Sequence, residues 1–71
     1  MQPILVNHVW KLVERTPESQ LLGLSDRALT DWLSDQLSKQ QDLTVAETET
    51  VKAYIRSRLI LIREMALAES S

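Results

Sequence analysis

The segment from Thr44 to Ala68 contains no glycine and no proline, and its sequence predicts one long helix over residues 45–68. The start of this helix is marked by Thr44-Val45-Ala46-Glu47, which matches a capping box. In that motif the Thr hydroxyl and the Glu carboxylate each satisfy a free backbone N–H. A helix of this extent is about 37 Å long at 1.5 Å per residue, so it is the longest element that the sequence predicts.

The predicted helix carries apolar side chains on two sides. One face, which we expect to meet the other helices of the chain, consists of Thr48, Val51, Ile55, Leu59, Ile62 and Ala66. A second strip, about 100° away around the helix, consists of Tyr54, Leu61, Met65 and Ala68. A chain of 71 residues cannot easily cover both, since domains of this size bury only about 60% of the surface that the unfolded chain exposes. The second strip therefore predicts a partner.

This second strip has the rhythm of a helix-pairing seam. Alternating steps of four and three residues connect Tyr54, Arg58, Leu61, Met65 and Ala68. The spacing suits an antiparallel pair of long helices in a dimeric bundle. We therefore predict a homodimer whose partner interface consists of Tyr54, Arg58, Leu61 and Met65. Arg58 would either pair with Asp31 or Asp35 of the same or a second chain, or cover apolar surface and extend its guanidinium into water.

The rest of the chain predicts two medium helices and a short helical corner. A helical pattern covers about residues 3–15. Because this segment contains several β-branched residues, a β-strand is an alternative for its first four or five positions. We expect a short helix or turn at 17–22, a second medium helix at 26–39, and a loose tail at 69–71. The predicted fold is a single all-α domain over residues 1–71, a small helical bundle completed by dimerisation.

Several residues mark the ends of these helices. Thr16 and Pro17 are typical of the cap and first position of a helix, and Gly23 is typical of the position that follows a helix. Ser25 is expected to cap the next helix.

Composition limits the chemistry available to the chain. It has no cysteine, which excludes disulfides and thiolate metal sites, and its single histidine, His8, cannot build a metal site alone. We therefore expect no metal and no cofactor. Apolar residues make up 44% of the chain and charged residues 25%, as in ordinary globular proteins. With neither disulfides nor metals to stabilise a small fold, oligomerisation is the remaining aid.

A basic stripe on the long helix suggests an alternative function. Lys52, Arg56 and Arg63 fall within about 40° of one another on the helix and could contact the phosphates of a nucleic acid. The net charge of −2 argues against this reading, because an acidic body repels the same polymer. A surface that faces solvent or a protein partner is favoured.

Candidate catalytic residues have simpler structural interpretations. Asp31 and Asp35 lie one turn apart, but with Arg27 and Lys39 they form a ladder of opposite charges typical of an exposed helix face. His8 lies at the edge of its helix, where a structural role is more common than a catalytic one. An enzyme completed across a dimer would need a pocket near these groups. Trp10 and Trp32 lie on or beside apolar faces and are expected to pack in the core.

We therefore expect a small, non-catalytic helical adaptor or regulatory protein that binds itself and another protein, with nucleic acid disfavoured. The first apolar segment has no basic residue before it, which is atypical of a signal peptide, and the run Leu59–Ile62 is far shorter than the roughly 20 residues of a membrane span. The expected location is the cytoplasm.

Overall fold

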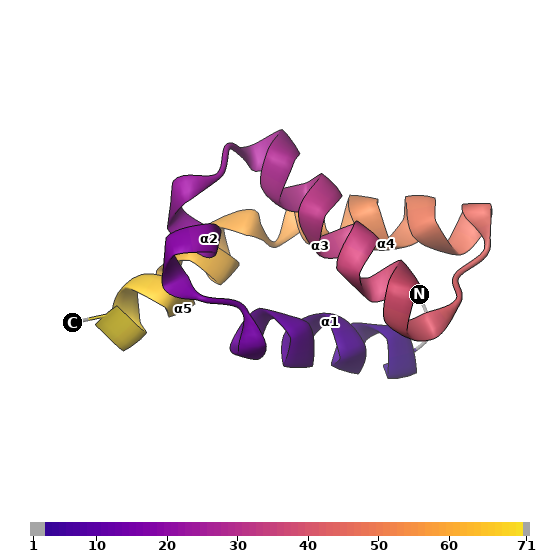
Figure 1. Cartoon of the computed structure of the whole chain (residues 1–71), viewed down its shortest axis with the longest axis horizontal. Helices are drawn as coiled ribbons and strands as arrows, with labels where there is room; N and C mark the ends of the chain where they lie inside the picture. The colour runs from indigo at the N-terminus through magenta and orange to yellow at the C-terminus, as the bar shows by residue number, and fades with distance from the viewer. Residues whose placement is uncertain (1–2, 71) are drawn as a thin grey trace.

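The computed structural model describes the backbone of residues 3–70 and the side chains of residues 5–68, and all the regular elements in this range are helices (Figure 1). In chain order these are α1 (Pro3–Arg15), α2 (Glu18–Gly23), α3 (Asp26–Gln41), α4 (Val45–Ser57) and α5 (Leu59–Ser70). The prediction of an all-α fold is confirmed, and the first residues of α1 form a helix rather than a strand. The expected tail falls partly within α5, and Ser71 lies outside the described residues.

The helices pack around one core. α3 packs on α4, α1 packs on both of them, and the short α2 packs on α5. Figure 1 shows α4 and α5 following each other along the length of the molecule, with the end of α5 extending past the other helices. The molecule measures 37 × 21 × 20 Å along its principal axes. The C-terminal segment thus spans the fold and leaves its last turns at one end.

The core contains apolar side chains from all five helices. They are Leu5, Val9, Leu12, Val13, Leu21, Leu29, Leu33, Leu37, Val51, Ile55, Leu59, Ile62 and Ala66. In α4 and α5 these residues belong to the first predicted face, of which Thr48 alone is half-buried. Trp10 and Trp32 are half-buried against this core, so the prediction that they pack there is confirmed.

Two of the predicted helix starts are confirmed by their hydrogen bonds. The Ser25 hydroxyl accepts from the Ala28 N–H at 3.2 Å at the start of α3. At the start of α4 the Thr44 hydroxyl accepts from the Glu47 N–H at 3.1 Å, and the Glu47 carboxylate accepts from the Thr44 N–H at 3.0 Å. These bonds satisfy N–H groups that a helix start otherwise leaves without a partner.

The expected ends of α2 differ from the observed ones. The Thr16 hydroxyl does not cap α2, because it is buried and donates to the Leu12 carbonyl at the end of α1, at 2.7 Å. Pro17 takes the cap position, and its side chain accepts no hydrogen bond there. Gly23 is the last residue of α2 and does not have a positive φ, so the left-handed conformation that glycine permits is not used.

The prediction of one continuous helix over 45–68 is wrong, since α4 and α5 are separated at Arg58. In a continuous helix the Arg58 N–H would donate to the Tyr54 carbonyl. It donates instead to the Ile55 carbonyl, one residue nearer, at 3.0 Å, and the Ser57 hydroxyl donates to the Tyr54 carbonyl at 2.7 Å. The local hydrogen bonding is therefore that of a tighter turn.

The serine hydroxyl does not explain this break by itself. Ser34 and Ser38 make the same bond to the carbonyl three residues earlier, and α3 continues through both. The difference lies in the neighbours of the two halves, since α4 packs on α3 and α1 while α5 packs on α2. Tertiary packing thus overrides a local sequence that favours a continuous helix.

Candidate protein interaction surface

α5 is apolar around almost its whole circumference, because the run Leu59–Ile62 places apolar side chains in four successive directions about 100° apart. A helix of this kind is normally enclosed by protein on all sides. α5 is not, since it carries four of the six large apolar residues that are exposed among the described side chains. The exposed fractions are 77% for Ile60, 46% for Leu61, 36% for Met65 and 55% for Leu67.

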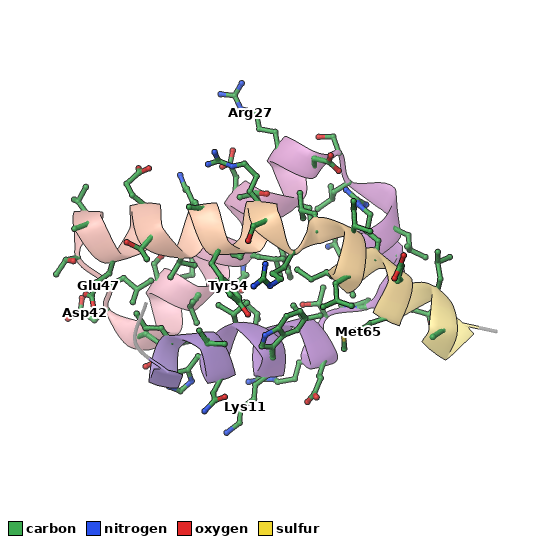
Figure 2. All side chains as sticks on the ribbon, turned by 180° about the vertical axis from the view of Figure 1, so that it is seen from behind. Lys11, Arg27, Asp42, Glu47, Tyr54 and Met65 are labelled. Carbon is green, nitrogen blue, oxygen red and sulfur yellow. The ribbon has the colours of Figure 1, made fainter. Side chains whose placement is uncertain are left out.

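These residues form two surfaces on opposite flanks of the helix. Leu61 and Met65, four residues apart, form what we call the side strip, and Figure 2 shows Met65 on the side of α5 that faces α1 in this view. The other surface continues from α4 into α5 and consists of residues spaced by three or four. This outer ridge comprises Ala53, Arg56, Ile60, Glu64 and Leu67, all of them exposed.

The four residues of the predicted partner interface are divided by the structure. Leu61 and Met65 are exposed on α5, whereas Tyr54 is half-buried in α4 and accepts a hydrogen bond from the Trp10 indole at 2.9 Å. Arg58 lies at the break, with its guanidinium carbon 5.1 Å from the centre of the Tyr54 ring. Among the described side chains of this chain it pairs with neither Asp31 nor Asp35; the residue is exposed, and its guanidinium donates to the Ser57 hydroxyl at 3.3 Å.

The predicted basic stripe is also divided. Arg63 is held inside the fold, where its guanidinium donates to the Leu21 carbonyl at 2.7 Å, and to the Leu24 carbonyl and the Asp26 carboxylate at 2.9 Å each. Its side chain is only 23% exposed. Lys52 lies 3.8 Å from the Asp31 carboxylate, and Arg56 is exposed on the outer ridge. A continuous cationic surface of these three residues is therefore not formed.

A groove of about 770 Å³ runs between α3, α4 and the start of α5. Its lining carries charges of both signs together with two apolar residues, namely Asp26, Arg27, Thr30, Asp31, Glu49, Lys52, Arg56, Leu59 and Ile60. Lys52 and Arg63 pair with two of the three acids. The Thr30 hydroxyl donates to the Asp26 carbonyl at 2.8 Å, so it is not directed at an acceptor within the groove.

The remaining candidate residues are found in structural contacts. Asp35 pairs with Lys39 at 3.3 Å as the predicted ladder requires, but Asp31 pairs with Lys52 of α4 rather than with Arg27. His8 is half-buried on α1 and lies 3.4 Å from the Gln41 amide. Within the part of the chain that the structure describes, no three metal-ligating side chains come together. None of the described helices has the length and apolar character needed to cross a membrane.

The exposure of Ile60 and Leu67 was not predicted from the sequence. The signal was present, because four consecutive apolar residues in a helix cannot all face one core. The run Leu59–Ile62 therefore indicates an exposed apolar residue as well as a buried one.

Comparison of this chain with protein-family models, with curated proteins and with solved structures finds no match in any of the three.

Proposed function

We propose that this protein is a small, non-catalytic helical adaptor or regulator that acts through protein–protein interaction and forms a homodimer through its C-terminal helix. One observation carries the proposal: α5 is apolar on nearly every side, yet a single chain covers only the face that contains Leu59, Ile62 and Ala66. Exposed apolar surface of this kind on a small protein marks an interaction site. The exposed surfaces of α5 are the proposed binding sites.

A nucleic-acid-binding role receives less support. Of the three basic residues it would use, Arg63 donates its hydrogen bonds to the protein itself and Lys52 lies beside a carboxylate. Asp31 and Glu49 line the same groove as Lys52 and Arg56, and their charges oppose a polyphosphate backbone.

The proposal of a non-catalytic role rests on the positions of the acidic candidates. A groove does lie beside Asp31, but the side chains of Asp31 and Asp35 are 57% and 61% exposed and each has a lysine partner. Such surface pairs are typical of solvated helix faces.

Size-exclusion chromatography with light scattering tests the homodimer. At tens to hundreds of micromolar we expect a mass approaching twice the 8.1 kDa of one chain. At least one of Ile60→Asp and Leu61→Asp should lower it to that of one chain, while Val45→Asp serves as the matched control because Val45 is 82% exposed at the far end of α4. A wild-type chain that stays at 8.1 kDa throughout would refute the homodimer.

A further inference from the structure

Ile60, the most exposed large apolar residue of α5, lies between two opposite charges on the outer ridge. Arg56 precedes it by four residues and Glu64 follows it by four, a spacing that places all three on one helix face. Arg56 and Ile60 both border the groove, so they share a face even across the break at Arg58. Among residues 5–68, neither Arg56 nor Glu64 has an ion-pair partner.

This order of residues is complementary to itself when reversed. If two copies lie antiparallel with a two-fold axis at Ile60, each Arg56 faces Glu64 of the other copy. Each Leu67 then faces Ala53 of the other copy, so a large apolar side chain meets a small one. One symmetric contact therefore contains two opposite-charge pairs around a central apolar pair.

We infer that a second copy of this chain binds the outer ridge in this antiparallel arrangement. The inference rests on the homodimer proposed above and specifies the face that forms it. The side strip is less suited to the same task, because a two-fold axis midway between Leu61 and Met65 places Arg58 against the uncharged Ala68 of the other copy.

The contact is small, which sets its strength. A standard interface buries about 800 Å² on each partner, and one helix ridge offers less than this. For comparison, the whole chain has a solvent-accessible surface of 4584 Å². Interfaces below the standard size are weak and reversible, so we expect the dimer to dissociate on dilution to low micromolar concentrations, below the range used in the chromatography described above.

Charge reversal tests the pairing directly. Arg56→Glu brings two glutamates together at each pair, and Glu64→Arg brings two arginines together. Each variant alone should raise the dissociation constant of the dimer by about tenfold or more, because two ion pairs are replaced by two repulsions. An equimolar mixture of the two variants restores both pairs in a heterodimer, and the double variant restores them in a homodimer, so both should return close to the wild-type dissociation constant.

Analytical ultracentrifugation measures these constants, and circular dichroism checks that each variant is folded. Lys11→Glu is the control for Arg56→Glu, since it makes the same change in net charge on an α1 side chain that Figure 2 shows pointing away from α4 and α5. A dimer that is insensitive to both reversals overturns this inference and leaves the homodimer intact, whereas a wild-type monomer removes both. If a reversal variant unfolds, Ile60→Asp replaces it: it should give monomers, and a dimer of wild-type strength would overturn the inference.

Discussion

The indole N–H of Trp10 donates a hydrogen bond to the Tyr54 hydroxyl at 2.9 Å, and the two rings meet edge to face with centroids 6.4 Å apart. This contact joins α1 to α4. Both side chains are half-buried against the core, and the Arg58 guanidinium lies over the same tyrosine ring, 5.1 Å from its centre. The Tyr54 hydroxyl and ring are therefore both engaged in contacts within their own chain.

Replacing Tyr54 by Phe removes the acceptor and keeps the ring. We expect this variant to unfold more easily by about 1 kcal/mol, because a half-buried indole N–H loses its hydrogen bond. Urea denaturation followed by tryptophan fluorescence measures the change.

A double-mutant cycle isolates the pair. Trp10→Phe and the Trp10→Phe/Tyr54→Phe double variant complete the cycle, and the coupling free energy should be about 0.5–1.5 kcal/mol. Additive effects would mean that the two side chains do not interact in solution.

Arg63 closes the C-terminal end of α2, since its guanidinium reaches two backbone carbonyls there as well as the Asp26 carboxylate. Arg63→Met should lower the free energy of unfolding by about 2–3 kcal/mol, and Arg63→Lys by less, because an ammonium cannot reproduce the planar fork of donors. Thermal denaturation of both variants measures this order.

Asp26→Asn provides the comparison. The Asp26 side chain is 79% exposed, so losing its charge should change the stability by less than about 1 kcal/mol. If Asp26→Asn lowers the free energy of unfolding as much as Arg63→Met does, the stabilisation by Arg63 comes from the ion pair and not from its hydrogen bonds to the backbone carbonyls.

Much of the fold could be predicted from local sequence. Ser25 and the Thr44–Glu47 capping box mark helix starts through hydrogen bonds within four residues, and the helical spacing of apolar residues identifies the buried faces. The break at Arg58 could not be predicted this way. It separates a helix that packs on α3 and α1 from one that packs on α2, and the contacts between α2 and α5 join residues about forty positions apart.

The candidate interaction surface could also be predicted only in part from the sequence. The exposed side strip follows from the spacing of Leu61 and Met65 in the sequence. The roles of Tyr54 and Arg63 do not, since each depends on a contact with a distant residue of the chain, Trp10 in one case and Leu21 in the other. A helical wheel places a side chain on a face but does not reveal which distant group occupies it.

Ile55 and Ile60 offer a matched pair of substitutions on either side of the break. Ile55 is fully buried and Ile60 is 77% exposed. Ile55→Ala should cost about 2–5 kcal/mol, a large share of the roughly 4–11 kcal/mol expected for a domain of this length. Ile60→Ala, measured at concentrations where the chain is monomeric, should stay within about 0.5 kcal/mol of wild type. Chemical denaturation at low protein concentration separates the two, and equal effects would contradict the packing described for α4 and α5.

Thr44 and Thr50 should respond in opposite directions to replacement by Ala, although both are exposed threonines in or next to α4. The Thr44 hydroxyl accepts from the Glu47 N–H, so Thr44→Ala removes half of the capping box and should destabilise the protein by about 1 kcal/mol. The Thr50 hydroxyl donates to the Ala46 carbonyl, which already belongs to a helical turn. Thr50→Ala should therefore stabilise the protein by a few tenths of a kcal/mol, because alanine has the higher helix propensity. Thermal melts of the two variants give the signs directly. A Thr44→Ala variant as stable as wild type would mean that the capping box does not fix the start of α4, and a loss of stability in Thr50→Ala would mean that its hydrogen bond to the Ala46 carbonyl outweighs the helix propensity of alanine.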